Sequence, residues 1–205
     1  PTGTYLPADE VGRLRAGLRD DILLVIDAAY AEFVARNDYT PGIELVDAGD
    51  NTVMCRTFSK IFALGGLRLG WAYCPASIAD VLNRVRNPFN VAAPSLAAGE
   101  AALADTGFFE LTRRHNDYWL GWMLDELAKL GLATTPSVCN FVLIQFPRDE
   151  GRTAQAADAF LRSQGIITRA MGGYGLSDWL RVTIGTGEEN QTVIAALAAF
   201  LASWN

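Results

Sequence analysis

One stretch, residues 57–70, constrains the fold of this chain more than any other part of the sequence. A hydrophobic run, Thr52–Cys55, leads into small polar residues and a single lysine, Lys60. Two glycines follow, then Arg68 eight residues after the lysine, and then a second apolar run, Leu69–Tyr73. Apolar runs on both sides of a Gly-Gly turn predict two strands joined by a loop. A lysine in such a place is poorly explained as a solvated surface charge.

The residue types around Lys60 suit a cofactor that carries both an aldehyde and a phosphate. A desolvated lysine loses its proton more easily and can attack a carbonyl as a neutral nucleophile. Thr57, Ser59 and Arg68 add two hydroxyls and a planar cation, a set that can bind a phosphate. Pyridoxal phosphate would use both features. The alternative is a lysine and an arginine that merely flank a glycine turn, and the local spacing leaves it open.

The composition excludes several classes of protein. The chain has 205 residues, of which 50% are hydrophobic and 20% charged, with a net charge of −6. This length allows one large domain or two small ones. The acidic balance argues against nucleic acid or an anionic membrane as a partner. Because no apolar run is long enough for a membrane span and no N-terminal signal is present, we expect a soluble cytoplasmic protein.

The cysteines and the histidine give no sign of a metal site. Cys55, Cys74 and Cys139 are widely spaced and are predicted to be buried free thiols of a reducing compartment. The single histidine, His115, has no close cysteine or histidine neighbours in sequence, so no zinc site is predicted. We expect His115 to be a surface or capping residue.

Hydrophobic periodicity predicts alternating strands and helices. The aliphatic run Ile22–Ile26 is typical of a strand buried on both faces, and the polar residues 35–51 predict a connecting loop. The other predicted strands, besides the two runs that flank the lysine, are Asn140–Phe146, Ile166–Thr168 and Trp179–Ile184. The predicted helices are one opened by Asp9 and Glu10, then Ile78–Arg86, Pro94–Leu103, Phe108–Leu130, Thr153–Ser163 and Glu188–Leu201. This order predicts an α/β layer over residues 1–105 and a smaller α+β domain over residues 106–205, joined by the long helix.

Two residues after the first predicted strand suit the ring of the cofactor. A pyridine ring works as an electron sink only while its nitrogen is protonated, which requires a buried carboxylate beside it. Asp27 stands at the carboxyl end of a predicted strand, where ligands of open α/β sheets bind. Tyr30 is placed to donate a hydrogen bond to the phenolic oxygen of the ring. The alternatives are a helix N-cap for Asp27 and simple packing for Tyr30.

Two arginines in the last third of the sequence are candidates for anion binding. Arg181 stands inside the apolar run Trp179–Ile184, and a buried arginine needs an anionic partner. It would clamp a carboxylate or a phosphate; the alternatives are a structural ion pair or an outward-facing position on the strand. Arg169 follows the short predicted strand Ile166–Thr168 and is a weaker case of the same kind, with a surface arginine as the alternative.

These residues, in this order, resemble the fold type I pyridoxal-phosphate aminotransferases. The matching stretches are Asp27–Tyr30, Thr57–Lys60 followed by Arg68, and Leu180–Gly185, and Pro1–Gly3 resembles the end of that family's Asn-Pro-Thr-Gly turn. Within the family the chain is most similar to the histidinol-phosphate aminotransferases. That similarity is carried by Asp27–Phe33, Ala63–Gly70, Pro88–Val91 and Ile166–Gly187. The resemblance covers essentially the whole chain. It implies the C-terminal part of a large domain, a mostly parallel sheet with helices, followed by a small α+β domain.

The resemblance also implies a role for each cofactor residue. Lys60 would bind pyridoxal phosphate covalently and move a proton between the substrate Cα and the cofactor C4′. Asp27 would pair with the pyridinium nitrogen, and Tyr30 would contact the ring hydroxyl. The residues implied to bind the cofactor phosphate are Thr57, Ser59 and Arg68.

For the substrate, Arg181 would clamp the carboxylate of the amino-acid and 2-oxo-acid partners, and Arg169 would help to hold the phosphate of histidinol phosphate. The implied activity is transamination between histidinol phosphate and 2-oxoglutarate, in histidine biosynthesis, by a homodimer. The alternatives are an aromatic amino-acid aminotransferase, or a decarboxylase of a phosphate-bearing amino acid or a C–S lyase on the same fold.

One departure from the family concerns the start of the sequence. Members of the family are considerably longer at the N-terminus, and the turn's asparagine, the glycine turn that helps to bind the cofactor phosphate and the aromatic residue that stacks on the ring have no counterpart here. We therefore expect a fragment whose sheet exposes edges and apolar faces. We expect it to be poorly active or inactive by itself.

Overall fold

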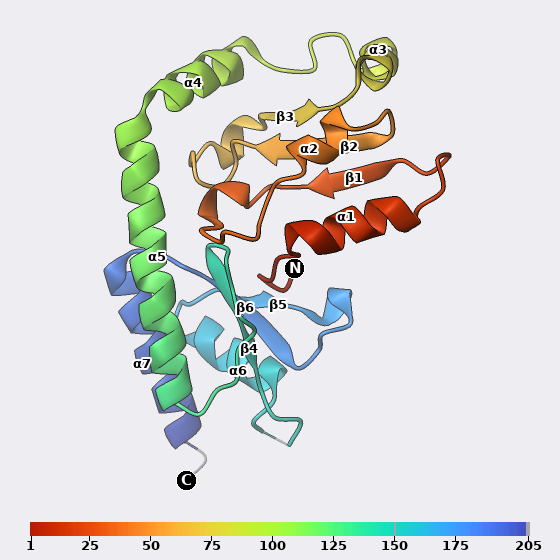
Figure 1. Ribbon diagram of the computed structural model, residues 1–205. Coiled ribbons are helices and arrows are strands. Elements are labelled where there is room, and N and C mark those ends of the chain that lie inside the picture. The colour runs from red at the N-terminus through yellow and green to blue at the C-terminus, as the bar shows by residue number, and fades with distance from the viewer. Residues whose placement is uncertain (150, 204–205) are drawn as a thin grey trace. The chain divides into compact units, whose positions relative to one another are not determined.

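The structure is a computed structural model that describes residues 1–149 and 151–203 (Figure 1). Its contacts divide the chain into two compact units. The N-terminal unit is Tyr5–Arg113, and the C-terminal unit is Pro1–Thr4 together with Arg114–Asn205. A long helix, α5 (Thr106–Lys129), begins in the first unit and continues in the second. A domain boundary at residue 105 stays a prediction, whereas the fold class, an α/β part followed by an α+β part, is confirmed.

A three-stranded sheet organises the N-terminal unit. β2 (Thr52–Thr57) lies between β1 (Leu24–Asp27), to which it is parallel, and β3 (Gly70–Tyr73), to which it is antiparallel (Figure 1). The residues of β1 alternate between half-buried and exposed, and Val25 is 54% exposed. The prediction of a strand buried on both faces is therefore wrong, because among the described residues β1 pairs with β2 alone and one of its faces is exposed. The predicted exposure of a sheet edge and of apolar side chains is confirmed.

The helices of this unit leave much apolar surface exposed. Besides the start of α5 they are α1 (Ala8–Gly17), α2 (Ile43–Asp47), α3 (Ala76–Val85) and α4 (Ala93–Ala104), with short 3-10 turns η1 (Ala31–Phe33) and η2 (Gly65–Leu67). α2 contradicts the prediction of a loop over residues 35–51. It follows Gly42, whose φ of +95° turns the chain, and it buries Val46 against Met54, but five residues are too few to show a helical period. α3 has no buried residue.

A second sheet organises the C-terminal unit, with β6 (Trp179–Thr183) between β4 (Phe141–Gln145) and β5 (Arg169–Ala170), and both pairings are antiparallel (Figure 1). One face of this sheet packs on three helices, α5, α6 (Ala154–Ser163) and α7 (Gly187–Ala202). The shared core is built from Val142, Ile144, Leu180, Val182, Met123, Leu127, Leu161, Val193 and Leu197, all at most 9% exposed. Alternate residues of a strand point to opposite faces, so Arg181 projects from the face opposite to this core.

The strand before Arg169 is displaced from its predicted position. The sequence predicts it at Ile166–Thr168, whereas the observed strand begins at Arg169. Two contacts with α6 explain the difference. The Ile166 backbone N–H donates to Leu161 O at 2.9 Å, and the Thr168 hydroxyl donates to Asp158 at 2.6 Å. These residues are held by α6, and the chain pairs with β6 only after them.

The cysteines follow their prediction in part. None of the three forms a disulfide among the described residues, as predicted, but only Cys139 is buried. Cys55 and Cys74 are half-buried, because they lie on the thinly covered first sheet or directly after it. Within the described residues, no helix combines the length and the apolar character that crossing a membrane requires.

Candidate functional site

The lysine segment is a loop that returns the chain from β2 to β3. Residues 58–69 form this loop, and the Phe58 backbone N–H donates to Leu69 O at 3.1 Å where the two ends meet. Phe58, Ile61 and Leu69 are buried, at 6%, 0% and 8% exposure. The loop is therefore anchored by its own apolar side chains, one of which follows Lys60 directly.

Helix α4 supports the same loop from outside. The Ser95 hydroxyl donates to Leu67 O at 2.7 Å, and Ser95 is 4% exposed. Gly99, one turn further along α4, lies against Leu69, and a Cβ at Gly99 would overlap the Leu69 Cδ2 atom and stand 3.6 Å from the Phe58 ring. The small residues that the sequence shows in this helix thus allow close contact with the loop.

The predicted phosphate-binding hydroxyls lie together. Thr57 Oγ1 donates to Ser59 Oγ at 2.9 Å, and the Ser59 backbone N–H donates to Thr57 Oγ1 at 3.1 Å. Arg68 lies on the same loop, with an exposed guanidinium that donates to Gly65 O at 2.7 Å. Its φ of +53° is left-handed, a conformation that side chains other than glycine rarely adopt. Strain of this kind is often found at ligand-binding turns.

Lys60 and Tyr30 meet although thirty residues separate them in the sequence. Lys60 is half-buried, and its Nζ stands 5.1 Å from the centre of the Tyr30 ring. Both residues belong to the N-terminal unit. The amine is thus held on a ring face, and within the described residues it has no carboxylate partner.

Asp27 ends β1 next to the lysine strand. The parallel register pairs it with Cys55, so Asp27, Cys55 and Thr57 project from the same face of the sheet. Burial, together with smaller contributions from the Asp27 carboxylate and from Cys74, raises the pKa of the Cys55 thiol. Asp27 Oδ1 accepts the Ala29 backbone N–H at 3.2 Å, which makes a local turn and caps no α-helix. The sequence predicts a buried Asp27 carboxylate. In the structure this carboxylate is exposed, because Asp27 stands at the end of an edge strand.

The two predicted substrate arginines face each other in the C-terminal unit. Arg169 on β5 pairs directly with Arg181 on β6. Directly opposed residues of antiparallel strands have Cβ atoms about 4.5–5.5 Å apart, and like charges in this arrangement repel. Each guanidinium lies over a ring: Arg181 is 4.8 Å from the centre of Phe141, and Arg169 is 5.7 Å from that of Tyr174. Among the described residues neither has an acidic partner, so the pair concentrates positive charge.

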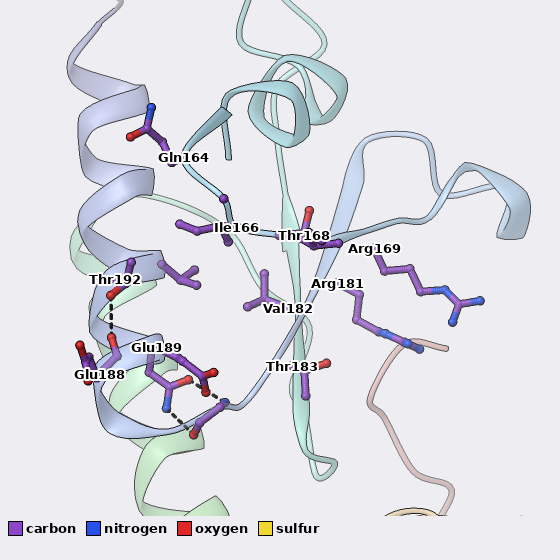
Figure 2. A pocket seen from close by; sticks show the side chains of 15 residues that line it. Gln164, Ile166, Thr168, Arg169, Arg181, Val182, Thr183, Glu188, Glu189 and Thr192 are labelled. Atoms are coloured by element: carbon purple, nitrogen blue, oxygen red, sulfur yellow. Dashed lines mark hydrogen bonds between the residues drawn. The ribbon is translucent and has the colours of Figure 1, made fainter. Parts of the chain in front are cut away.

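A cavity of about 660 Å³ adjoins these arginines. It belongs to the C-terminal unit, and its walls include the first turns of α7, with Glu188 and Glu189, and the segment 164–168. Figure 2 shows the side chains of Arg169 and Arg181 extending the same way from adjacent strands, while Glu188 and Glu189 lie at the start of α7. The hydrogen bond from the Thr186 backbone N–H, followed by that with the Thr186 hydroxyl, lowers the pKa of Glu189.

Sequence reasoning missed a buried asparagine that shapes the turn after β6. Asn190 is 1% exposed; its Oδ1 accepts the Gly185 backbone N–H at 2.9 Å, and its Nδ2 donates to Gly185 O at 3.1 Å. The sequence does not reveal this role of Asn190, because its hydrogen-bond partner is the backbone of Gly185 and not a side chain that a motif could show. His115 is exposed, as predicted, and its Nε2 lies 2.9 Å from the same Gly185 O. No group of three or more metal-ligating side chains occurs within the residues that the structure describes.

Comparison with known proteins shows a family match and similar curated sequences. The sequence model of the family described as "Aminotransferase class I and II" matches residues 1–197. The histidinol-phosphate aminotransferase of Paramagnetospirillum magneticum is 73% identical over 201 residues, and that of Rhodospirillum rubrum is 59% identical over 202 residues. Each match covers 98% of this chain and 55% of the relative, so the chain spans about half the length of the curated relatives it matches.

Solved structures share the fold. The histidinol-phosphate aminotransferase of Sinorhizobium meliloti, solved in complex with pyridoxal-5′-phosphate, superposes with a TM-score of 0.91 at 31% identity, over 100% of this chain and 56% of the other. The L-threonine-O-3-phosphate decarboxylase of Porphyromonas gingivalis superposes with a TM-score of 0.81 at 25% identity, over 98% of this chain and 62% of the other.

Proposed function

The chain belongs to the aminotransferase class I and II family, and from this we propose that Lys60 is the pyridoxal-phosphate lysine of an aminotransferase that acts on histidinol phosphate. The observation that carries the proposal is the setting of the Lys60 amine. Its Nζ lies half-buried over the Tyr30 ring at 5.1 Å, on the loop that begins with the bonded hydroxyls of Thr57 and Ser59. An amine held beside phosphate-binding hydroxyls matches an aldehyde cofactor that carries a phosphate.

The residues present fit that cofactor. Within the described residues, no ion pair neutralises Lys60, Asp27 or Arg68, so their charges are available to a ligand. The Thr57 and Ser59 hydroxyls and the free donors of Arg68 would hold the phosphate. The Asp27 carboxylate, on the same sheet face as Thr57, would hold the ring nitrogen.

Each side chain then has a defined task. When bound, pyridoxal phosphate supplies an electron sink for the bond that breaks at the substrate Cα. Lys60 Nζ would hold the cofactor and afterwards carry the proton that leaves the substrate Cα. Asp27 would keep the ring nitrogen protonated, and the Tyr30 hydroxyl would donate to the phenolic oxygen of the ring. The lysine is thus both the anchor and the base.

The arginine pair supports a substrate with a phosphate or carboxylate. Two guanidinium groups that lack acidic partners and repel each other gain stability when an anion binds between or beside them. We assign the carboxylate of the amino-acid and 2-oxo-acid partners to Arg181 and the phosphate of histidinol phosphate to Arg169. The names of the two curated relatives reported above, both histidinol-phosphate aminotransferases, support this substrate.

A half-reaction tests the proposal. The chain is loaded with pyridoxal phosphate, an amino donor is added, and mass spectrometry measures the conversion of the cofactor to its amine form. Histidinol phosphate should convert the cofactor about tenfold faster than phenylalanine, the factor expected for one charged contact. Preference for phenylalanine would indicate an aromatic amino-acid aminotransferase. Release of carbon dioxide from a phosphate-bearing amino acid would indicate a decarboxylase. Because this chain is expected to be poorly active by itself, the result that would overturn the proposal is a failure of borohydride to trap pyridoxal phosphate on Lys60.

The proposed enzyme is a cytoplasmic homodimer. Three cysteines that form no disulfide among the described residues suit a reducing compartment. Phe89 is 99% exposed and Val85 71% exposed, and apolar side chains this accessible commonly mark a protein interface. Sedimentation velocity would measure the mass in solution, and a monomer at every concentration would exclude the dimer.

A further inference from the structure

One buried ion pair of the N-terminal unit has no task in the chemistry above. The Arg56 guanidinium donates through Nη2 at 2.7 Å and through Nε at 3.2 Å, both to Glu32 Oε1. The side chains of Arg56 and Glu32 are 17% and 7% exposed. In each other ion pair between described residues, at least one side chain is more than 30% exposed. The pair is therefore set apart by its burial.

The two partners flank the residues that hold the cofactor lysine. Glu32 lies in η1, which begins directly after Tyr30, and Arg56 directly precedes Thr57 on β2. Arg56 also contacts β3. It is opposite Trp71 in the register of β2 with β3, and its guanidinium lies 5.6 Å from the centre of the Trp71 ring. The contacts thus form a line from β3 through Arg56 and Glu32 to the turn that carries Tyr30.

The energetics make stability a poor explanation for this pair. Removing two charges from water costs several kcal/mol each, and their attraction offsets this only when every polar atom is satisfied. Here Glu32 Oε2 is buried without a hydrogen-bond partner among the described residues. Arg56 Nε and Nη2 both donate to Glu32 Oε1, so the other carboxylate oxygen receives no hydrogen bond from this guanidinium. Two apolar side chains of similar volume would serve stability as well or better.

We propose that Glu32 and Arg56 are positioning residues that hold Tyr30 against Lys60 Nζ. The ion pair fixes η1 to the end of β2. Because Tyr30 directly precedes η1, the Tyr30 ring is thereby held against Lys60 Nζ, on the loop that follows β2. The importance of this geometry for cofactor binding rests on the proposed function, whereas the geometry itself does not.

Methionine variants separate a positioning role from a structural one. Glu32→Met and Arg56→Met each leave one buried charge unpaired, which is strongly destabilising, so either single variant can fail to fold. The double variant Glu32→Met/Arg56→Met removes both charges and should fold with native stability in urea unfolding. Arg19→Met is the matched control, since the Arg19–Asp21 pair lies in the same unit with side chains 75% and 68% exposed.

The readout uses the two lysines of the chain, Lys60 and Lys129. A trace of acetic anhydride labels free amines, and peptide mass spectrometry gives the ratio of labelled Lys60 to labelled Lys129. Lys129 is 68% exposed, lies in the other unit and serves as the internal standard. In the double variant the ratio should rise about two- to fivefold, the change expected when one cation–π contact is lost. The control should keep the native ratio.

The outcomes are distinct. A native labelling ratio in a folded double variant would overturn the proposal, because Tyr30 would then hold Lys60 without the ion pair. In parallel, borohydride trapping of pyridoxal phosphate on Lys60 should fall in the double variant but not in the control. If the native chain traps no pyridoxal phosphate, the proposed function fails, yet the acetylation ratio still decides whether the ion pair positions Tyr30.

Discussion

The two units support their functional side chains in different ways. In the C-terminal unit, Arg181 stands on a sheet whose other face packs on three helices around a continuous buried core. In the N-terminal unit, the cluster around Met54 contains only two other buried residues, Ala28 and Val46. Much of its apolar surface is exposed there, including Val25 on β1 and Val85 on α3.

The lysine and the arginines are therefore held in position by different interactions. Lys60 depends on local contacts: the buried ends of its loop, the close approach of Gly99 and the ring of Tyr30. The arginines depend on a sheet held by burial of its opposite face. Substitutions should therefore act on the two groups through different residues and with different magnitudes.

The largest effect on stability is expected from the core of the C-terminal unit. Leu197→Ala removes a side chain that is 0% exposed within the cluster, and it should lower the free energy of unfolding by about 2–5 kcal/mol. Val25→Ala in the N-terminal unit is the control, because Val25 is 54% exposed and its loss should change stability by less than about 0.5 kcal/mol. Urea unfolding measures both free energies. Equal losses in the two variants would contradict the difference in burial between the two units.

Gly99→Ala tests the local support of the lysine loop. The added Cβ would overlap Leu69 Cδ2, and overpacking of this kind should cost about 1–3 kcal/mol. Labelling of Lys60 relative to Lys129 should change as well, because Leu69 ends the loop. Gly12→Ala is the control: nothing lies within 4 Å of a Cβ there, so this helical substitution should stabilise by about 0.5–1 kcal/mol. A neutral Gly99→Ala would contradict the loop's dependence on α4.

Arg181→Gln should move binding and stability in opposite directions. Loss of the guanidinium should weaken binding of 2-oxoglutarate, whose carboxylate is assigned to Arg181, about tenfold, as measured by titration calorimetry. Relief of the repulsion from Arg169 should raise the free energy of unfolding by about 0.2–1 kcal/mol. Arg148→Gln removes an exposed arginine outside the cavity and should change neither binding nor the repulsion. A loss of stability in Arg181→Gln would show that the arginine is a structural partner instead.

A local effect on the C-terminal unit is expected at the cap of α7. Thr186→Ala removes a side chain that caps the helix and should cost about 1 kcal/mol at neutral pH. The hydrogen bonds of the same cap hold the Glu189 pKa below its ordinary value. Glu189 therefore stabilises the folded state above the ordinary pKa of glutamate, and this contribution is lost as the pH falls through the lowered pKa. Glu189→Gln should show a flatter dependence of stability on acid pH than the native chain, and parallel curves would exclude the assignment.

The sequence predicts the chemistry of the lysine segment better than its surroundings. The strand, the hydroxyls, Lys60 and the glycines follow one another within a short stretch of sequence. The structure keeps this stretch together as the loop between β2 and β3. The contact between Lys60 and Tyr30 follows from the parallel register of two strands, which the apolar runs imply but do not fix. The burial of Asp27 was overestimated, since a hydrophobic run does not reveal how many neighbours its strand will have.

The second site shows the same limit more clearly. The sequence indicates Arg181 because it interrupts an apolar strand. Its pairing with Arg169 cannot be predicted in the same way, because the strand of Arg169 begins three residues later than the apolar run that predicts it. The Glu32–Arg56 pair left no trace in the sequence, because its partners are charged residues on separate elements that become buried only when η1 packs on β2. Buried polar pairs and register are set by tertiary packing, which periodicity does not report.

The most direct test of this account is borohydride reduction of the native chain in the presence of pyridoxal phosphate, followed by a peptide map. The chain has two lysines, one on the loop between β2 and β3 and one at the exposed end of α5. We expect a phosphopyridoxyl mass on the peptide that contains Lys60 and little on the peptide that contains Lys129. Equal labelling of both, or none on Lys60, would contradict the assignment of Lys60 as the cofactor lysine.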